Sequence, residues 1–327
     1  MDLDFSAWQP YLLTLAFVSL ALLGAGFAVK DRRRHLLRAA GWVLFGLYWP
    51  FQAPEFFWPT MTSEPDPING WFTLLGPLFL WYIAYHEWKS FQWNEDPKAL
   101  KWFAGASFTA ALTYFVIYEL PPVTEWIIHQ TTLQSAWMYN WVFFGGEPRA
   151  FVVQDSFLGP EGFRDSHICL PDSGGLSQAC PGSPAHDYAV TVVLACTAIQ
   201  SIMIFVGAIA CLEADGRRKR LGYLYTVPVI YALNLFRNAG IVYGYKDLDW
   251  GMFGIDSFEW MHSYVGKIGS LVAMVFIALA VFATLPELHH NILDLFDLRK
   301  RKAPGFFAKR PPPPEDAAAP PPAEATP

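Results

Sequence analysis

The sequence predicts an all-α integral membrane protein, a bundle of about seven transmembrane helices with a sizeable extracellular loop. The composition is 53% hydrophobic and 17% aromatic, and only 16% of the residues are charged. This balance is shifted from that of soluble proteins toward apolar and aromatic side chains. Seven apolar runs approach the length of about 20 residues that a helix needs to cross a bilayer. These runs lie at residues 11–29, 38–57, 71–88, 102–120, 188–212, 221–245 and 258–285.

The first two runs differ in how well they fit a transmembrane helix. The first has Asp2 and Asp4 ahead of it and the basic segment DRRRHLLR behind it, without the pattern of a cleaved signal peptide. We therefore expect it to remain as an anchor. The second is the weakest, because Pro50 and Pro54 interrupt it and its outer half, WPFQAPEFFWP, is typical of an aromatic interfacial segment.

The basic residues predict the orientation in the membrane. Of the 23 Lys and Arg residues, 18 fall on one face if the seven spans alternate. They form clusters at residues 30–38, 89–101, 217–220 and 299–310. Because basic residues concentrate on the cytoplasmic side, we expect a cell-membrane protein with the N terminus outside and the C terminus in the cytoplasm.

The segment at about 121–187 is predicted to be an extracellular loop. It contains Cys169 and Cys180, and in an oxidising compartment these form a disulfide or stay as two free thiols, since spacing alone leaves both open. The stretch AFVVQDSF favours a short hairpin. The residues around 125–145 favour a helix at the membrane interface, with the side chains Trp126, Trp137, Tyr139 and Trp141.

We divide the chain into a transmembrane catalytic domain, residues 1–298, and a disordered basic and Pro-rich cytoplasmic tail, residues 299–327. The basic part of the tail is expected to contact anionic lipid headgroups. The sequence has no internal repeat, Gly-rich phosphate loop, CxxC pair or HExxH motif. We therefore expect no cofactor, no metal and no nucleic-acid partner.

Three polar residues inside the predicted spans are the candidate catalytic residues: Cys196, Arg237 and His262. Ionisable groups within spans are costly and usually line a site or a pathway. Counting along each helix at about 1.5 Å per residue places Cys196 roughly 13 Å below the outer surface, with Arg237 at a similar depth and His262 roughly 9 Å deep. All three are thus expected at one level in the outer leaflet.

These residue types suit acyl transfer by a cysteine nucleophile. An adjacent imidazole or guanidinium stabilises a thiolate, and an arginine can stabilise a tetrahedral oxyanion. The alternative for a single cysteine in a span is a small apolar side chain, as we interpret Cys211, and a single histidine at the end of a span is more often interfacial. A central arginine such as Arg237 is harder to explain without a partner.

The three segments around these residues resemble the archaeosortase and exosortase family of integral membrane proteins. The nucleophile motif of that family resembles ACTAIQSI, which contains Cys196. Its arginine motif resembles NLFRNAGIV, which contains Arg237. Its third motif, which carries histidine or arginine, resembles HSYVGKIGSL, which contains His262. The resemblance covers residues 185–285 and is only architectural over 1–184.

The resemblance implies a sortase-like cysteine transpeptidase. Its partners would be secreted surface proteins, such as an S-layer glycoprotein, with a C-terminal sorting signal that combines a Pro-Gly-Phe-type motif, a hydrophobic helix and a basic cluster. Cys196 would form a thioester with the protein, with Arg237 as the stabiliser of the transition state and His262 as the proton donor and acceptor. A membrane lipid amine would then accept the protein, and an archaeal cell membrane is the implied location.

Other polar residues near these motifs are candidates for supporting roles. Thr197 and Gln200 could donate hydrogen bonds to the oxyanion, although a threonine in a span most often bonds its own backbone. Asn234 and Asn238 flank the motif arginine, and Asn238 could orient it. Lys267 is a second candidate for proton transfer, with a helix-packing lysine as the alternative.

Two other classes of protein compete with this interpretation. A seven-helix protein with a lysine in its last span can bind retinal, but the third span has no carboxylate for a counter-ion until Glu87 at its end. A transporter would be expected to carry paired acids, broken helices or inverted repeats near the midplane, and the sequence has no such repeat.

Overall fold

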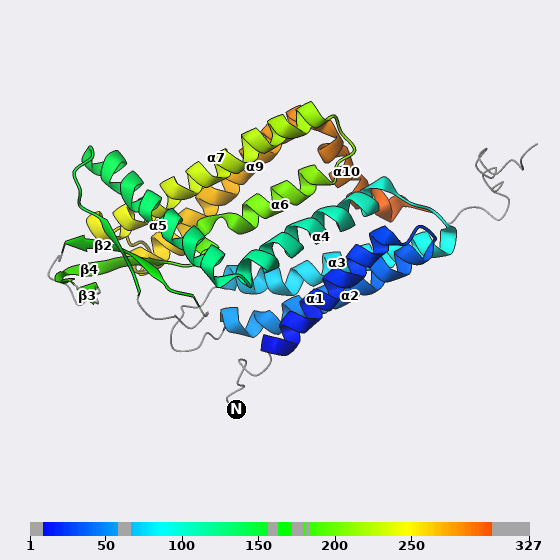
Figure 1. Cartoon of the computed structure of the whole chain (residues 1–327), viewed down its shortest axis with the longest axis horizontal. Coiled ribbons are helices and arrows are strands. Elements are labelled where there is room, and N and C mark those ends of the chain that lie inside the picture. The colour runs from blue at the N-terminus through cyan, green and yellow to red at the C-terminus, as the bar shows by residue number, and fades with distance from the viewer. Residues whose placement is uncertain (1–8, 58–66, 156–162, 172–178, 181–182, 303–327) are drawn as a thin grey trace, which may run out of the picture.

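The structure is a computed structural model of the whole chain, and it describes residues 9–57, 67–155, 163–171, 179–180 and 183–302. The chain is mostly helical. Most of the tail predicted to be disordered, residues 303–327, lies outside the described residues. The long helices run side by side, with a small sheet at one end and α10 at the other (Figure 1).

The first four helices form the N-terminal half of the bundle. They are α1 (Gln9–Ala28), α2 (Arg33–Phe57), α3 (Pro67–Trp93) and α4 (Lys98–Tyr118). α2 packs against both α1 and α3, and α4 packs against α1. Contrary to our expectation, Pro50 and Pro54 do not interrupt α2, which continues as a helix to Phe57.

The second half of the bundle contains α6 (Ile199–Ala210), α7 (Gly216–Val242), α9 (Gly266–Thr284) and α10 (Pro286–Asp297). α6 packs against α4 and α7, and α7 packs against α9. The Asp215 carboxylate accepts hydrogen bonds from the backbone N–H groups of Arg217 and Arg218, which satisfies free donors in the first turn of α7. Between α7 and α9 lie the π-helical segments η3 (Tyr243–Asp247) and η4 (Trp260–Val265) and the short α8 (Ser257–Glu259).

Three helices within the described residues are long and apolar enough to cross a membrane: Pro10–Ala28, Lys98–Tyr118 and Ser257–Thr284. They agree closely with three of the predicted spans. The total of seven spans stays a prediction, because the other helices are less apolar or, like α6, shorter.

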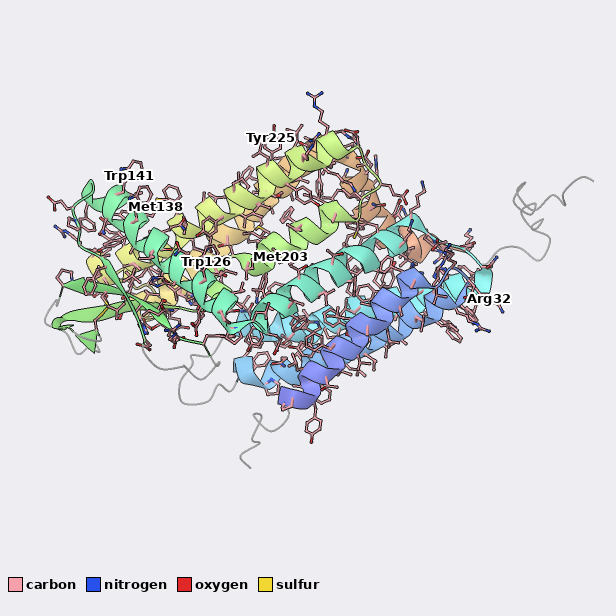
Figure 2. The ribbon with its side chains drawn as sticks, in the orientation of Figure 1. Arg32, Trp126, Met138, Trp141, Met203 and Tyr225 are labelled. Carbon is pink, nitrogen blue, oxygen red and sulfur yellow. A yellow bond between two sulfur atoms is a disulfide. The ribbon has the colours of Figure 1, made fainter. Side chains whose placement is uncertain are left out.

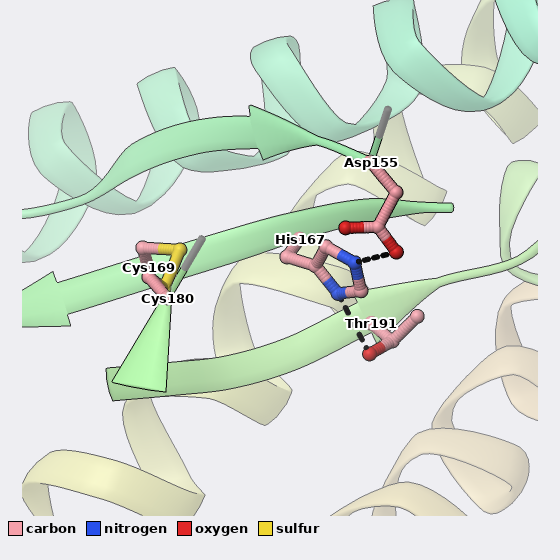
Figure 3. The surroundings of a disulfide bond; sticks show 5 residues. All are labelled: Asp155, His167, Cys169, Cys180 and Thr191. Carbon is pink, nitrogen blue, oxygen red and sulfur yellow. Dashed lines mark hydrogen bonds and ion pairs between the residues drawn. A yellow bond between two sulfur atoms is a disulfide. The ribbon is translucent and has the colours of Figure 1, made fainter. Parts of the chain in front are cut away.

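The predicted loop at 121–187 contains regular structure. The helix α5 (Pro121–Phe144) ends at Gly145, a left-handed residue with φ 63° that suits glycine. Four antiparallel strands follow in the spatial order β1-β2-β4-β3. Their bounds are β1 (Phe151–Gln154), β2 (Ser166–Pro171), β3 (Ala179–Cys180) and β4 (Ser183–Val192). The stretch predicted to form a short hairpin supplies β1, which pairs with the more distant β2. A disulfide joins Cys169 of β2 to Cys180 of β3, with a Cα–Cα distance of 6.3 Å (Figure 3).

The aromatic face predicted for α5 is only partly correct. Trp126 and Trp141, labelled in Figure 2, and also Trp137 are exposed on α5, as an interfacial helix requires. Tyr139 is buried, because this side of α5 packs against α7 and the sheet, and its hydroxyl donates a 2.6 Å hydrogen bond to Asp247 Oδ2. The prediction that Tyr139 faces the interface is therefore wrong.

The largest correction concerns the fifth predicted span, 188–212. Its first residues belong to β4, a 3-10 turn, η2 (Leu194–Thr197), follows, and only Ile199–Ala210 is α-helical. The run AVTVV is rich in β-branched residues, and a short apolar run does not distinguish a buried strand from a helix. Cys196 therefore lies at a strand-to-helix junction and not nine residues down a helix.

Four ion pairs bring the basic clusters together at the α10 end of the bundle, where Figure 2 also places Arg32. The pairs are Arg34–Asp96 at 2.8 Å, Lys101–Glu213 at 3.0 Å, Arg301–Glu95 at 2.7 Å, and Arg218–Glu287. The predicted clustering on one face of the bundle is thus correct for residues up to 302. Which side of the membrane this face occupies stays a prediction.

Candidate active site

Cys196 is held in the tight turn between β4 and α6. Its backbone N–H donates a 2.9 Å hydrogen bond to the carbonyl of Val193, which closes the 3-10 turn. Ala198 then adopts φ 62°, a left-handed conformation that costs a non-glycine residue energy and is frequent at functional sites. The half-buried Cys196 side chain packs on the apolar cluster that joins α5, the sheet and α7.

Two side-chain amides of α7 converge on the backbone carbonyl of Cys196. Asn234 Nδ2 donates a 2.7 Å hydrogen bond to this oxygen and Asn238 Nδ2 donates one of 3.1 Å. The two asparagines are four residues apart, so they share one face of the helix. Asn238 also donates to Ser135 Oγ of α5 at 3.3 Å. We call these two residues the asparagine pair.

Arg237 lies between the two asparagines along α7, and the structure brings it close to the nucleophile candidate. Its guanidinium lies within range of an electrostatic interaction with the Cys196 thiol, and its Nε donates a 3.4 Å hydrogen bond to the carbonyl of Gly266. A Cβ atom on Gly266 would lie 3.1 Å from this Nε and 3.0 Å from the carbonyl oxygen of Met261. The absence of a side chain at 266 is thus what lets the guanidinium approach α9.

His262 lies in η4, one helical turn before Gly266. Its ring stacks on that of Phe258, with 5.4 Å between the centroids and 7° between the planes. π-helical turns occur frequently at functional sites. η4 meets the other π-helical segment, η3, because Gly244 leaves room for the Met261 side chain. Gly266 directly follows η4, and its carbonyl accepts the hydrogen bond from Arg237, so this bond links the segment that carries His262 to Arg237.

The predicted supporting residues have other partners. Thr197 Oγ1 donates 2.6 Å to the carbonyl of Leu194, so this hydroxyl serves the 3-10 turn, as threonines in spans commonly do. Gln200 Nε2 donates 3.0 Å to the hydroxyl of Tyr114 on α4. Asn238 binds the backbone carbonyl of Cys196, and its role in orienting Arg237 stays a prediction. Lys267 follows the glycine that packs against the guanidinium and is half-buried.

Sequence reasoning missed the role of the asparagine pair and the contacts of Ser135 and Tyr114. The available signal was two amide side chains four residues apart on either side of Arg237, because polar groups within a span are costly unless they have partners. Ser135 and Tyr114 lie more than 80 residues from their partners in sequence, and nothing in their local pattern marked them.

The sheet beside the site contains a second group of polar side chains (Figure 3). The buried His167 of β2 lies between Thr191 Oγ1, at 3.0 Å from Nδ1, and Asp155 Oδ2, at 3.1 Å from Nε2. Burial raises the pKa of the neighbouring Asp165 carboxyl. Among the residues that the structure describes, no group of three or more His, Cys, Asp or Glu side chains has the geometry to hold a metal ion.

Comparison with known proteins agrees with the class that the motifs indicate. The family model described as transmembrane exosortase (Exosortase_EpsH) matches residues 183–279, the part of the chain that contains Cys196, Arg237 and His262. Over these residues the chain is similar to the archaeosortase/exosortase family.

Two curated relatives are similar to most of the chain. Archaeosortase A of Haloferax volcanii is 26% identical over 308 residues, which cover 88% of this chain and 94% of the relative. Archaeosortase A of Natronomonas pharaonis is 26% identical over 236 residues, 71% of this chain and 66% of the relative. No solved structure matches the chain.

Proposed function

We propose that this protein is a membrane-embedded cysteine transpeptidase that removes the C-terminal sorting signal of surface proteins and joins them to a lipid amine. Similarity to the archaeosortase/exosortase family supports a sortase-like processing function in a membrane. The observation that carries the cysteine mechanism is that the asparagine pair, which flanks Arg237 on α7, holds the backbone carbonyl of Cys196.

In the first half-reaction the Cys196 thiolate attacks the scissile backbone carbonyl. The C–S bond forms, and the negative charge that develops on the oxygen is stabilised by Arg237. The C–N bond then breaks, and His262 donates a proton to the leaving amine of the hydrophobic helix. The products are a thioester on Cys196 and the released signal.

In the second half-reaction a lipid amine attacks the thioester. His262 accepts the proton of the amine, an amide bond forms, and the Cys196 thiolate leaves. Lys267 is the alternative group for the proton transfers, since it lies five residues beyond His262 in the same continuous helix. The site would face the outer leaflet, where a surface protein ends its export.

The substrate signal proposed here is a Pro-Gly-Phe-type motif followed by a hydrophobic helix and a basic cluster. α7 and α9 expose large apolar side chains, so a substrate helix within the bilayer can approach α7, which carries Arg237, and its neighbour α9. These side chains include Leu224, Leu233, Phe236, Leu271 and Phe276. Polar residues at the two ends of the substrate helix would set its depth in the bilayer.

The experiment that tests the proposal follows processing of a co-expressed surface protein that carries this signal. The chain offers a matched control, because Cys196 and Cys211 both carry free, half-buried thiols and Cys211 lies beside Thr109, at the other end of α6. We expect Cys196→Ala to abolish cleavage and the lipid adduct at normal membrane expression, and Cys211→Ala to retain both. Unchanged processing with Cys196→Ala would refute the mechanism and favour transport.

A further inference from the structure

A groove on the outer surface of α2 and α3 lies away from the candidate active site. It has a volume of about 410 Å³, within the range of roughly 300–1,000 Å³ that ligand sites occupy. Small side chains from both helices leave it hollow, and aromatic side chains spaced along α3 form one wall. The residues used here are Ala39, Ala40, Ala84, Trp81, Tyr85 and Trp88.

The position of the groove along the helices follows from the helix periodicity. Trp81, Tyr85 and Trp88 repeat at four and three residues, so they follow one face of α3. Trp81 Nε1 donates 3.3 Å to the carbonyl of Val43, which holds the indole across the two helices near mid-span. The groove therefore runs from mid-span toward the end where α2 begins and α3 ends.

Cationic side chains lie at that end of the groove. Lys89 follows the last lining tryptophan, and its Nζ lies 5.5 Å from the centroid of the Tyr85 ring. Arg33 precedes the lining residue Leu36 by three positions on α2, and its side chain is 81% exposed. Its ion pair with Asp31 is loose, at 3.9 Å, and Arg32 adds a further positive charge at this end.

We propose that this groove binds an anionic membrane phospholipid. One hydrocarbon chain lies over the alanines, between the aromatic side chains, and the phosphate lies between Lys89 and Arg33. The alanine surface offers a chain van der Waals contact, and the pair of cations complements a phosphate at the depth where headgroups begin. This site is separate from the lipid amine of the proposed reaction, because Cys196 lies beside the sheet at the opposite end of the bundle (Figure 1).

The test compares lipids with identical chains and different headgroups on the full-length purified protein. Native mass spectrometry in detergent measures retention of added phosphatidylglycerol and phosphatidylcholine. A cation near a membrane surface contributes about 1 kcal/mol to anionic lipid binding, which corresponds to about fivefold in affinity. We expect phosphatidylglycerol to bind preferentially, Lys89→Gln and Arg33→Gln each to weaken it about fivefold, and the double variant to weaken it about 25-fold.

Two further variants separate a defined site from general lipid adhesion. Ala40→Phe fills the groove from an exposed position and should reduce binding of both lipids. Arg220→Gln removes an exposed cation of α7 at the same end of the bundle and should leave binding unchanged. Equal retention of the two lipids by the unmodified protein would overturn the proposal. So would full binding by the double variant or by Ala40→Phe.

Discussion

Removal of the amide donors of the asparagine pair tests whether α7 positions the nucleophile. Asn234 and Asn238 donate hydrogen bonds of 2.7 and 3.1 Å to the carbonyl of Cys196, in the same turn that the left-handed Ala198 follows. Each bond contributes about 1 kcal/mol net, and a buried carbonyl without any donor costs about 1–3 kcal/mol. A reacting group displaced by about 1 Å loses on the order of 10²-fold in rate.

We therefore expect Asn234→Asp or Asn238→Asp to slow processing about tenfold, and the double variant about 100-fold. Aspartate has the shape of asparagine but, when ionised, no N–H donor, so it also repels the carbonyl oxygen. The assay is the rate of substrate cleavage per membrane-inserted enzyme, with the Tm of the purified variants measured in parallel. A rate loss larger than the fall in folded fraction is the signature of positioning.

Ser135→Ala is the matched control for this experiment. It removes the 3.3 Å contact of Asn238 with α5 and leaves both hydrogen bonds to the Cys196 carbonyl in place. Its processing rate should stay close to the unmodified rate, since both hydrogen bonds that position Cys196 remain. A double aspartate variant that processes substrate at the normal rate would refute the positioning argument.

Three other predictions concern the surroundings of the site. Gly266→Ala places a Cβ 3.1 Å from Nε of Arg237, so we expect lost processing with normal membrane expression, whereas unchanged processing would mean that the guanidinium needs no contact with α9. The hydrogen bonds from Arg164 hold the pKa of the Glu125 carboxyl below its usual range, so their contribution to stability is present above about pH 4.3 and is lost as the pH falls through the lowered pKa. Thermal unfolding measured as the pH is lowered through and below about 4.3 should show this loss, and Glu125→Gln should remove it. Reduction of the disulfide that joins β2 to β3 should destabilise the sheet by about 2–4 kcal/mol, measured by hydrogen exchange of its amides, and unchanged protection would contradict this.

The sequence determined the character of the protein and the identity of the candidate residues. Apolar length and composition gave the helices at Pro10–Ala28, Lys98–Tyr118 and Ser257–Thr284 with close bounds, because a bilayer imposes its thickness on a single segment. The gathering of basic residues at one end of the bundle was predictable because successive spans alternate in direction and basic residues concentrate on one side of a membrane. The three family motifs could be found in order without any tertiary information.

Only the tertiary structure decided how Cys196 is presented. The apolar run before it fits a strand or a helix equally, and the choice was made by pairing with β2, where Ser166 lies opposite Val192. Pairing of this kind depends on partners distant in sequence, and so do the bonds from α7 to the Cys196 carbonyl. The local sequence shows which side chains are costly in a membrane, whereas contacts between residues distant in sequence supply their hydrogen-bonding or charge partners.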